Sequence, residues 1–280
     1  MPSGGRQLAA QKAAAAASKL DVEAGTATAQ AAAQAGGWVT SKAALYVAIL
    51  VLVAASATAV AVYTGSDQNV WLADGSLHIS ATKDESGYKS GRINSKAGGS
   101  WFPGMQLADG ATLGSLRVEA RIRVPQPGQG IWAAFWLSPP NFAYGGWPLS
   151  GEIDVMEAIN SMSSITQDPD NVVDDTSTQQ PDQKPYSDGF HTYAVDWDRD
   201  SVTLSIDGLQ AKRVVSRQLD PGGGWWTAAA PDDPQAPFNI PFSIILNVAV
   251  GGDWPGPPDD STPFPATMLV DYVRVVGTAE

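Results

Sequence analysis

Three acidic residues, Glu152, Asp154 and Glu157, lie within six positions of one another and are interleaved with apolar residues. In a regular β-strand, alternation puts Glu152 and Asp154 on one face and sends Glu157 to the opposite face. One extra residue at Val155-Met156, a β-bulge, would return Glu157 to the face of Glu152, and bulges often lie beside active sites. We therefore predict a bulged strand with three carboxylates in a row on one face.

Carboxylates this close repel one another, so the pKa of at least one of them is expected to be raised. Glycoside chemistry uses such a pair, in which one carboxylate attacks an anomeric carbon and the other protonates the leaving oxygen. The residues alone leave two alternatives open. A solvent-facing edge strand could carry scattered acids. Three carboxylates could also bind calcium, although the Asn, Asp and Gly ligands of the usual calcium loops are missing.

The composition excludes several other chemistries. None of the 280 residues is Cys, which excludes disulfides, thiolate zinc sites and a cysteine nucleophile. A net charge of −12 argues against a nucleic-acid partner. The chain has ten Trp residues, a high number for a side chain that needs a packing or stacking role. We expect a monomer that needs no metal or other cofactor for catalysis; a structural calcium ion is compatible with the sequence but not indicated by it.

The chain divides into a low-complexity, Ala-rich tail (1–42), an apolar segment (43–63) and the remainder (67–280). The apolar segment carries no charge and is long enough to cross a bilayer core of about 30 Å at about 1.5 Å per residue. Basic residues precede it and acidic residues follow it, which predicts a type II membrane protein with residues 67–280 extracellular or lumenal. A signal peptide cleaved near Ala55–Ala57, giving a secreted protein, is the alternative, and a buried core helix is a third.

Alternation of apolar and polar residues recurs after residue 67 and predicts several half-buried strands. They cover residues 77–81, 116–124, 191–197, 202–206 and 269–275. In the last of these, Val270, Tyr272 and Arg274 are expected to share one face. Phe242–Val250 is almost continuously apolar, which indicates a strand buried on both faces. Short strands separated by Gly, Pro and Asp turns predict one antiparallel β-sandwich.

The segment Gly151–Glu157 resembles the signature of glycoside hydrolase family 16, in the bulged E-x-D-x-x-E form of its laminarinase-like, endo-β-1,3-glucanase branch. Further segments resemble the blocks of that family in the expected order, over about residues 69–276. They are Ser90–Lys96, Gln129–Leu137, Gly146–Pro148, Phe190–Trp197, Asp207–Gly208, Leu246–Gly256 and Met268–Val275. The resemblance implies an all-β, concanavalin-like jelly roll of two curved antiparallel sheets, with an open cleft on the concave face.

The same resemblance implies a retaining glycoside hydrolase that cleaves internal β-1,3 or mixed β-1,3/1,4 glucan linkages by double displacement. Glu152 would be the nucleophile, Glu157 the general acid/base, and Asp154 the residue that holds Glu152 and tunes the pair. Trp offers sugars an apolar face and an N–H for hydroxyls, although core packing is the alternative role for each ring. The residues expected to contact the β-glucan are Arg92, Trp132, Trp136, Trp147 and Trp254.

Two departures from the family pattern bear on substrate binding. Family members carry several tens of residues before the strand that matches Val70–Ser80, whereas here the apolar segment ends shortly before it. Residues 161–188 have no His or Trp, one of which usually follows the acidic motif, and we expect this acidic, polar stretch to be a mobile loop.

Two other functions remain open. A polysaccharide-remodelling transglycosylase would pass through the same glycosyl-enzyme, with a sugar hydroxyl replacing water in the second step. A non-catalytic β-glucan-binding protein would need neither carboxylate. Such relatives generally lose one of the two Glu residues, and this chain keeps both.

Overall fold

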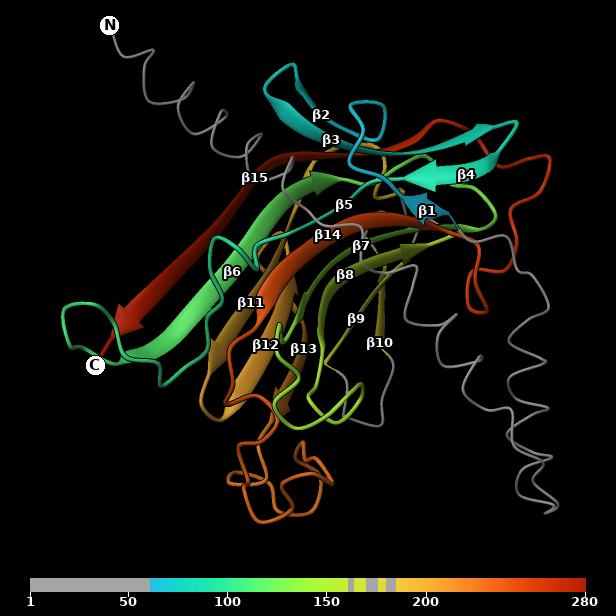
Figure 1. Cartoon of the computed structure of the whole chain (residues 1–280). Coiled ribbons are helices and arrows are strands. Elements are labelled where there is room, and N and C mark those ends of the chain that lie inside the picture. The colour runs from blue at the N-terminus through green and yellow to red at the C-terminus, as the bar shows by residue number, and fades with distance from the viewer. Residues whose placement is uncertain (1–60, 161–163, 170–175, 180–184) are drawn as a thin grey trace, which may run out of the picture. The chain divides into compact units, whose positions relative to one another are not determined.

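The computed structural model describes residues 61–160, 164–169, 176–179 and 185–280, which form two β-sheets (Figure 1). The larger sheet has the strand order β1-β4-β3-β15-β6-β11-β12-β13, with β2 paired to β3. Its strands are β1 (Val62–Tyr63), β2 (Val70–Ala73), β3 (Ser76–Asp84), β4 (Gly87–Ser90), β6 (Leu113–Arg123), β11 (His191–Asp198), β12 (Ser201–Ile206), β13 (Leu209–Val215) and β15 (Ala266–Ala279).

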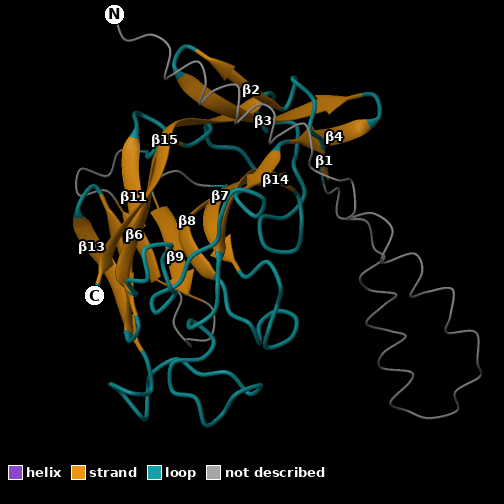
Figure 2. Ribbon diagram, turned by 60° about the vertical axis from the view of Figure 1, so that its left-hand side comes forward, coloured by secondary structure: helices purple, strands orange, loops and turns teal. Residues whose placement is uncertain are grey.

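The smaller sheet has the order β10-β9-β8-β7-β14-β5 and lies against the larger one (Figure 2). Its strands are β5 (Arg92–Asn94), β7 (Ile131–Ser138), β8 (Ile153–Ile159), β9 (Ser164–Pro169), β10 (Thr176–Gln179) and β14 (Ser243–Val250). Among the described strands, the neighbours pair antiparallel except β1 and β4, which are parallel. This two-sheet, all-β arrangement confirms the β-sandwich predicted from the alternation and the jelly-roll-like fold that the family resemblance implied.

The core lies between the two sheets and is built from the apolar residues of the alternating strands. On β6, Val118, Ala120 and Ile122 are fully buried, while Glu119 and Arg121 between them lie on the outer face. Trp197 of β11 is buried edge-on against Phe242, with 5.3 Å between ring centroids. Strand β14 is buried along almost its whole length, as its continuous apolar sequence predicted.

One predicted alternation is wrong. The pairing of β15 with β6 shifts between Val270 and Tyr272, so Asp271 is an extra residue in a bulge. Val270 is therefore buried in the core. Tyr272 and Arg274 lie on the outer face instead, where both hydrogen-bond to the carboxylate of Glu119. The shared face expected for the three residues does not exist, because one inserted residue reverses the parity of a strand.

The described part of the β-domain includes residues 61–66, which precede the predicted boundary at residue 67. Ala61 is 7% exposed and packs in the core, and its N–H donates to the carbonyl of Val250 at 3.2 Å. Residues 61–63, the last of the predicted membrane segment, thus belong to the β-domain; residues 43–60 and the tail 1–42 lie outside the described residues. Within the described ranges, no helix has the length and apolarity needed to cross a bilayer.

The segment 161–188 is not the plain loop that we expected. It contains β9 and β10, which extend the smaller sheet beyond β8. Residues 161–163, 170–175 and 180–184 of this segment lie outside the described residues. The strand that carries the acidic motif is therefore an inner strand, with β7 on one side and β9 on the other.

Candidate active site

The predicted β-bulge is present in β8. Asp154 pairs with Trp136 and Met156 pairs with Phe135, so Val155 is an extra residue in the register between β8 and β7. The bulge restores the parity that Glu157 needs to lie on the same face as Asp154. The sequence prediction of a bulge at Val155-Met156 is confirmed.

The three carboxylates meet in one cleft on this face of the smaller sheet. Glu152, immediately before β8, lines it together with Asp154 and Glu157, which are only 8% and 7% exposed. The full lining consists of Tyr63, Arg92, Trp132, Ala134, Trp136, Glu152, Asp154, Glu157, Asn247 and Ala249. These residues come from β1, β5, β7, β8, β14 and the entry to β8, so the cleft runs across the strands of the sheet.

The entry to β8 depends on a glycine. Gly151 has φ of 75°, a left-handed conformation that glycine adopts without strain. A Cβ atom at this position would lie 2.8 Å from Cγ of Pro237. Gly151 therefore allows the chain to turn closely past the Pro237 loop and to present Glu152 at the mouth of the strand.

Trp132 contacts the acidic cluster directly. It lies on β7, diagonal to Glu157, and its indole Nε1–H donates to Oε1 of Glu157 at 2.9 Å. The edge of the ring system packs against Trp254, with 5.3 Å between centroids and 79° between planes. Trp254 itself is 51% exposed on the loop after β14. The two rings form an aromatic wall that starts at Glu157 and ends at solvent.

A second group of side chains in the cleft lies around Trp136 of β7, which pairs with Asp154, and extends over β14 to β5. The guanidinium of Arg92 lies 4.9 Å from the centroid of the Trp136 ring and 5.7 Å from that of Tyr63. The indole N–H of Trp136 donates to Oδ1 of Asn247 at 2.8 Å. Asn247 in turn donates from Nδ2 to the hydroxyl oxygen of Tyr63 at 3.2 Å. Because an indole N–H can only donate, it fixes the direction of each hydrogen bond in this series.

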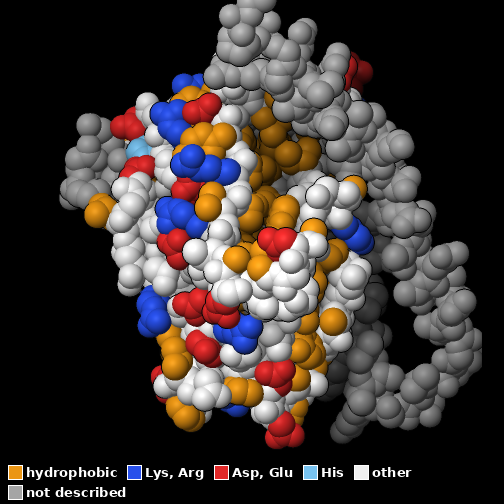
Figure 3. All heavy atoms as spheres, turned by 90° about the vertical axis from the view of Figure 1, so that its left-hand side faces the viewer, with side chains coloured by type: hydrophobic (Ala, Val, Ile, Leu, Met, Phe, Trp, Pro, Cys, Tyr) orange, Lys and Arg blue, Asp and Glu red, His pale blue; other side chains and the backbone are white. Residues whose placement is uncertain are grey.

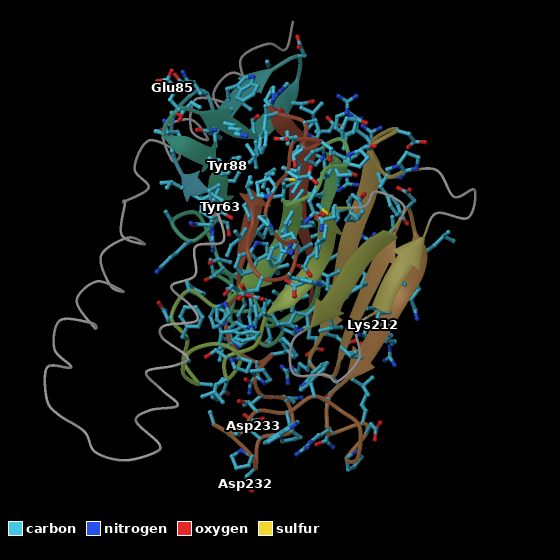
Figure 4. All side chains as sticks on the ribbon, turned by 90° about the vertical axis from the view of Figure 1, so that its right-hand side faces the viewer. Tyr63, Glu85, Tyr88, Lys212, Asp232 and Asp233 are labelled. Atoms are coloured by element: carbon cyan, nitrogen blue, oxygen red, sulfur yellow. The ribbon has the colours of Figure 1, made fainter. Side chains whose placement is uncertain are left out.

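Tyr63 is positioned by β1, the first strand of the domain (Figure 4). Burial raises the pKa of its hydroxyl above the ordinary value, and the lowering effect of nearby Arg92 does not cancel this. Tyr63 is therefore a neutral phenol at physiological pH, able to donate its own proton while it accepts from Asn247.

The loop that carries Trp254 is tied to the ends of β7 and β8. The carbonyl of Pro255 accepts from Gln129 Nε2 and from Asn160 Nδ2, both at 2.7 Å. Oδ1 of Asn160 accepts from the backbone N–H of Gly130 at 2.6 Å. Asn160, at the end of β8, thus joins the strand of the carboxylates to the aromatic wall.

These features agree with the comparison of the whole chain with known proteins. A family model described as glycosyl hydrolases family 16 matches residues 61–273. The chain belongs to glycosyl hydrolase family 16. The match begins within the described domain at Ala61, so β1 and its Tyr63 are part of the family 16 domain.

Individual relatives agree with the family assignment. A glucan endo-1,3-β-glucosidase A1 from Niallia circulans is 36% identical over 232 residues, which is 76% of this chain and 31% of that protein. A glucan endo-1,3-β-glucosidase from Cryptopygus antarcticus is 32% identical over 226 residues, 74% of this chain and 76% of that protein. The solved endo-β-1,3-glucanase from Pyrococcus furiosus superposes with a TM-score of 0.62 at 32% identity, covering 78% of this chain and 80% of that one. The chain thus spans less than a third of the length of the first relative.

Within this family 16 domain, the residues predicted to bind substrate fall into two groups. Arg92, Trp132 and Trp136 line the cleft with the carboxylates, and Trp254 touches its wall through Trp132. Trp147 lies on the loop between β7 and β8, is 64% exposed, and is not among the lining residues. The indole N–H groups of Trp132 and Trp136 are engaged by protein oxygens, so these two rings offer a sugar their faces rather than donors.

Sequence reasoning missed two cleft residues of the family 16 domain. Asn247 is a single polar residue inside the apolar run Phe242–Val250, and it is only 5% exposed. A lone amide in such a run is a recognisable signal, because a buried polar group needs partners. Tyr63 gave no such signal, because it is the last residue of the predicted apolar segment.

The calcium alternative finds no support in the geometry. In the parts of the chain that the structure describes, no group of three or more His, Cys, Asp or Glu side chains is arranged to hold a metal ion. His191 lies on β11 with Nδ1 at 2.7 Å from Asp207 and Nε2 at 3.3 Å from Asp188. Its ring packs beside Tyr186, away from the cleft residues.

Proposed function

We propose that this chain is a retaining endo-glycosidase that hydrolyses internal β-1,3 or mixed β-1,3/1,4 glucan linkages. One observation carries the proposal: the bulge at Val155 brings Glu152, Asp154 and Glu157 to one face of β8, inside a cleft that crosses the sheet. The relatives from Niallia circulans and Cryptopygus antarcticus are both glucan endo-1,3-β-glucosidases, which supports the β-1,3-glucan substrate.

In the first step, a carboxylate oxygen of Glu152 attacks the anomeric carbon while Glu157 gives its proton to the glycosidic oxygen. The carbon–oxygen bond to the leaving chain breaks as the glycosyl-enzyme ester forms. Retaining enzymes place the two carboxyl groups about 5–5.5 Å apart, so that one reaches carbon and the other the leaving oxygen.

In the second step, Glu157 acts as a base. It removes a proton from water, the water oxygen attacks the anomeric carbon, and the bond to Glu152 breaks. Each step inverts the configuration, so the product retains it. We assign Asp154, which lies between the two on the same face, to holding Glu152 in place and to keeping the proton on Glu157 by its negative charge.

The substrate side of the proposal rests on two groups of side chains beside the carboxylates. Trp132 and Trp254 offer stacking surfaces. Arg92 and the hydroxyl proton of Tyr63 offer donors to sugar hydroxyls, beside the face of Trp136. Since these groups lie on different strands across the sheet, they suit a chain that lies along the cleft rather than a single sugar bound at its end.

The test separates the roles of the two Glu residues by stereochemistry. Glu152→Ala leaves space beside the anomeric carbon, so added azide attacks an activated aryl glycoside directly and gives the inverted product. Glu157→Ala still forms the glycosyl-enzyme from the activated substrate, and azide then intercepts it with retention. Activity of Glu157→Ala on unactivated glucan should fall by about 10²–10⁴-fold.

The matched control is Glu119→Gln, which removes a buried carboxylate on the opposite sheet and should leave the stereochemical outcome unchanged. Retention with azide in Glu152→Ala would reverse the two assignments. Full glucan cleavage by both Ala variants would remove the active-site assignment altogether. Products longer than the substrate would indicate a transglycosylase, and binding of laminarin without turnover would indicate a glucan-binding protein.

A further inference from the structure

The contact between Trp132 and Glu157 reaches beyond substrate stacking. The donor is an indole N–H, the acceptor is one named oxygen of the carboxyl group, and the distance is 2.9 Å. Glu157 is 7% exposed, so the hydrogen bond is made where water competes little. Stacking on a sugar would not by itself require the indole N–H to donate to Glu157.

The chemistry of the two groups favours one position for the carboxylic proton. An indole N–H has no acceptor capacity, so Oε1 of Glu157 must accept from Trp132 in both protonation states. A carbonyl oxygen is a stronger acceptor than the hydroxyl oxygen of a carboxylic acid, so the hydrogen bond from Trp132 to Oε1 favours the proton on Oε2 when Glu157 is protonated. The hydrogen bond thus favours one of the two oxygens as the acid.

We propose that Trp132 is a positioning residue for the acid/base step: its indole holds Glu157 with Oε1 turned to the wall and Oε2 presented to the glycosidic oxygen. The proposal rests on the role assigned to Glu157 above. It gives Trp132 a function that stacking alone does not supply, and it assigns different tasks to two Trp residues of one strand face.

The charges around Glu157 determine how this hydrogen-bond donor affects the protonation of Glu157. Glu152 and Asp154 line the same cleft, and Arg92 enters it from β5. Nearby carboxylates favour the protonated form of Glu157, whereas a donated N–H favours the carboxylate. A group that must give a proton in one step and take one in the next needs a pKa near the working pH, and the indole opposes the acidic neighbours.

Trp132→Phe tests the proposal, because it keeps an aromatic ring and removes the N–H. The basic limb of the pH profile of kcat/KM on laminarin reports loss of the catalytic proton. We expect that limb to move upward by about one pH unit, since one hydrogen bond to the carboxylate is lost. The loss of kcat/KM should be about ten-fold or more on laminarin and clearly smaller on an aryl glycoside, whose leaving group needs little protonation.

Trp136→Phe is the matched control. Trp136 is the same residue type on the same face of β7, but its N–H donates to Asn247 rather than to a carboxylate. This variant should raise KM for laminarin and leave the basic limb where it is. An unmoved limb in Trp132→Phe, or an equal shift in both variants, would overturn the proposal.

A variant that fails to fold would leave nothing to measure, so a second substitution keeps the test decisive. Replacing Trp132 by benzothienylalanine exchanges the N–H for sulfur at nearly constant shape, and it should give the same limb shift as Trp132→Phe. The azide experiment on Glu157→Ala does not involve Trp132. Retention there together with an unmoved limb would reject the role of Trp132 alone, whereas failure of the azide experiment would reject the role of Glu157.

Discussion

Both sheets of this protein carry buried carboxylates, but the partners of these carboxylates differ between the sheets. On the larger sheet, Glu119 of β6 is 5% exposed and accepts from Arg117 at 2.7 Å, from Arg274, and from the hydroxyl of Tyr272 at 3.2 Å. Basic and acidic side chains are interspersed over this outer face (Figure 3). On the smaller sheet, three carboxylates share one cleft with each other.

The pKa of Glu119 follows from its partners. Burial alone would raise it, but the hydrogen bonds from Arg117 and Arg274 outweigh burial and hold the pKa of that carboxyl below its usual range. A carboxylate in this setting is kept ionised and stabilises the fold. A carboxylate among other carboxylates can instead exchange a proton, at some cost to stability. The contrast indicates which acids serve structure and which serve chemistry.

Asp154→Asn in the cleft is the strongest test of this difference between the cleft carboxylates and Glu119. We expect kcat on glucan to fall on the order of 10²-fold, because a fixed charge beside the reacting pair is removed, while the stereochemistry stays retaining. The melting temperature should stay level or rise slightly, since one of three clustered like charges is gone. Calorimetry and anomer analysis of the products measure both. A large drop in melting temperature with normal kcat would place Asp154 with the structural acids.

Glu119→Gln should give the opposite result. The variant loses charge-assisted hydrogen bonds from two arginines, and we expect unfolding to become easier by about 1–3 kcal/mol at neutral pH, with kcat unchanged. Because the pKa of Glu119 is depressed in the folded state, its stabilisation is present above the ordinary value of 4.5 and is lost as the pH falls through the folded pKa.

Denaturant titrations of both proteins across pH 3–8 check this linkage. The difference in unfolding free energy between the parent and Glu119→Gln should narrow below about pH 4.5. A difference that is constant over the whole range would show that the ion pairs of Glu119 contribute little beyond packing.

The smallest expected effect concerns the rim of the cleft. Trp254→Ala should weaken binding of long glucans by about 1–2 kcal/mol, through loss of an apolar stacking surface, and should affect short substrates less. The fold should persist, because Trp254 is 51% exposed. Affinity electrophoresis in laminarin and a melting curve test the two statements. Loss of cooperative melting would show that Trp254 serves core packing rather than substrate binding.

The two β-bulges differ in whether they could be predicted from the sequence. The bulge in β8 was predictable, because the spacing of Glu152 and Glu157 makes sense only if one residue is inserted between them. The bulge at Asp271 in β15 was not predicted, because apolar residues occur at both odd and even positions of that strand. Parity can be inferred from a sequence only where chemistry or strong burial demands one face.

Some residues of the site were more predictable than others. The carboxylates and the Trp residues of β7 could be predicted from their residue types and spacing. Tyr63 enters the cleft because β1 pairs with β4, a contact far from the motif in sequence and invisible in local patterning. The use of the indole N–H groups by Glu157 and Asn247 was also out of reach, since rotamers and register decide which oxygen each donor meets.

Asn160 gives the cleft a further property. It ends β8 with φ of 52°, a conformation that Asn tolerates, and its amide joins the backbone of Gly130 to that of Pro255. The loop of Trp254 can rise from the sheet only by breaking these bonds. In the proposed glycosidase, this fixed wall would limit the thickness of the glucan segment that fits in the cleft.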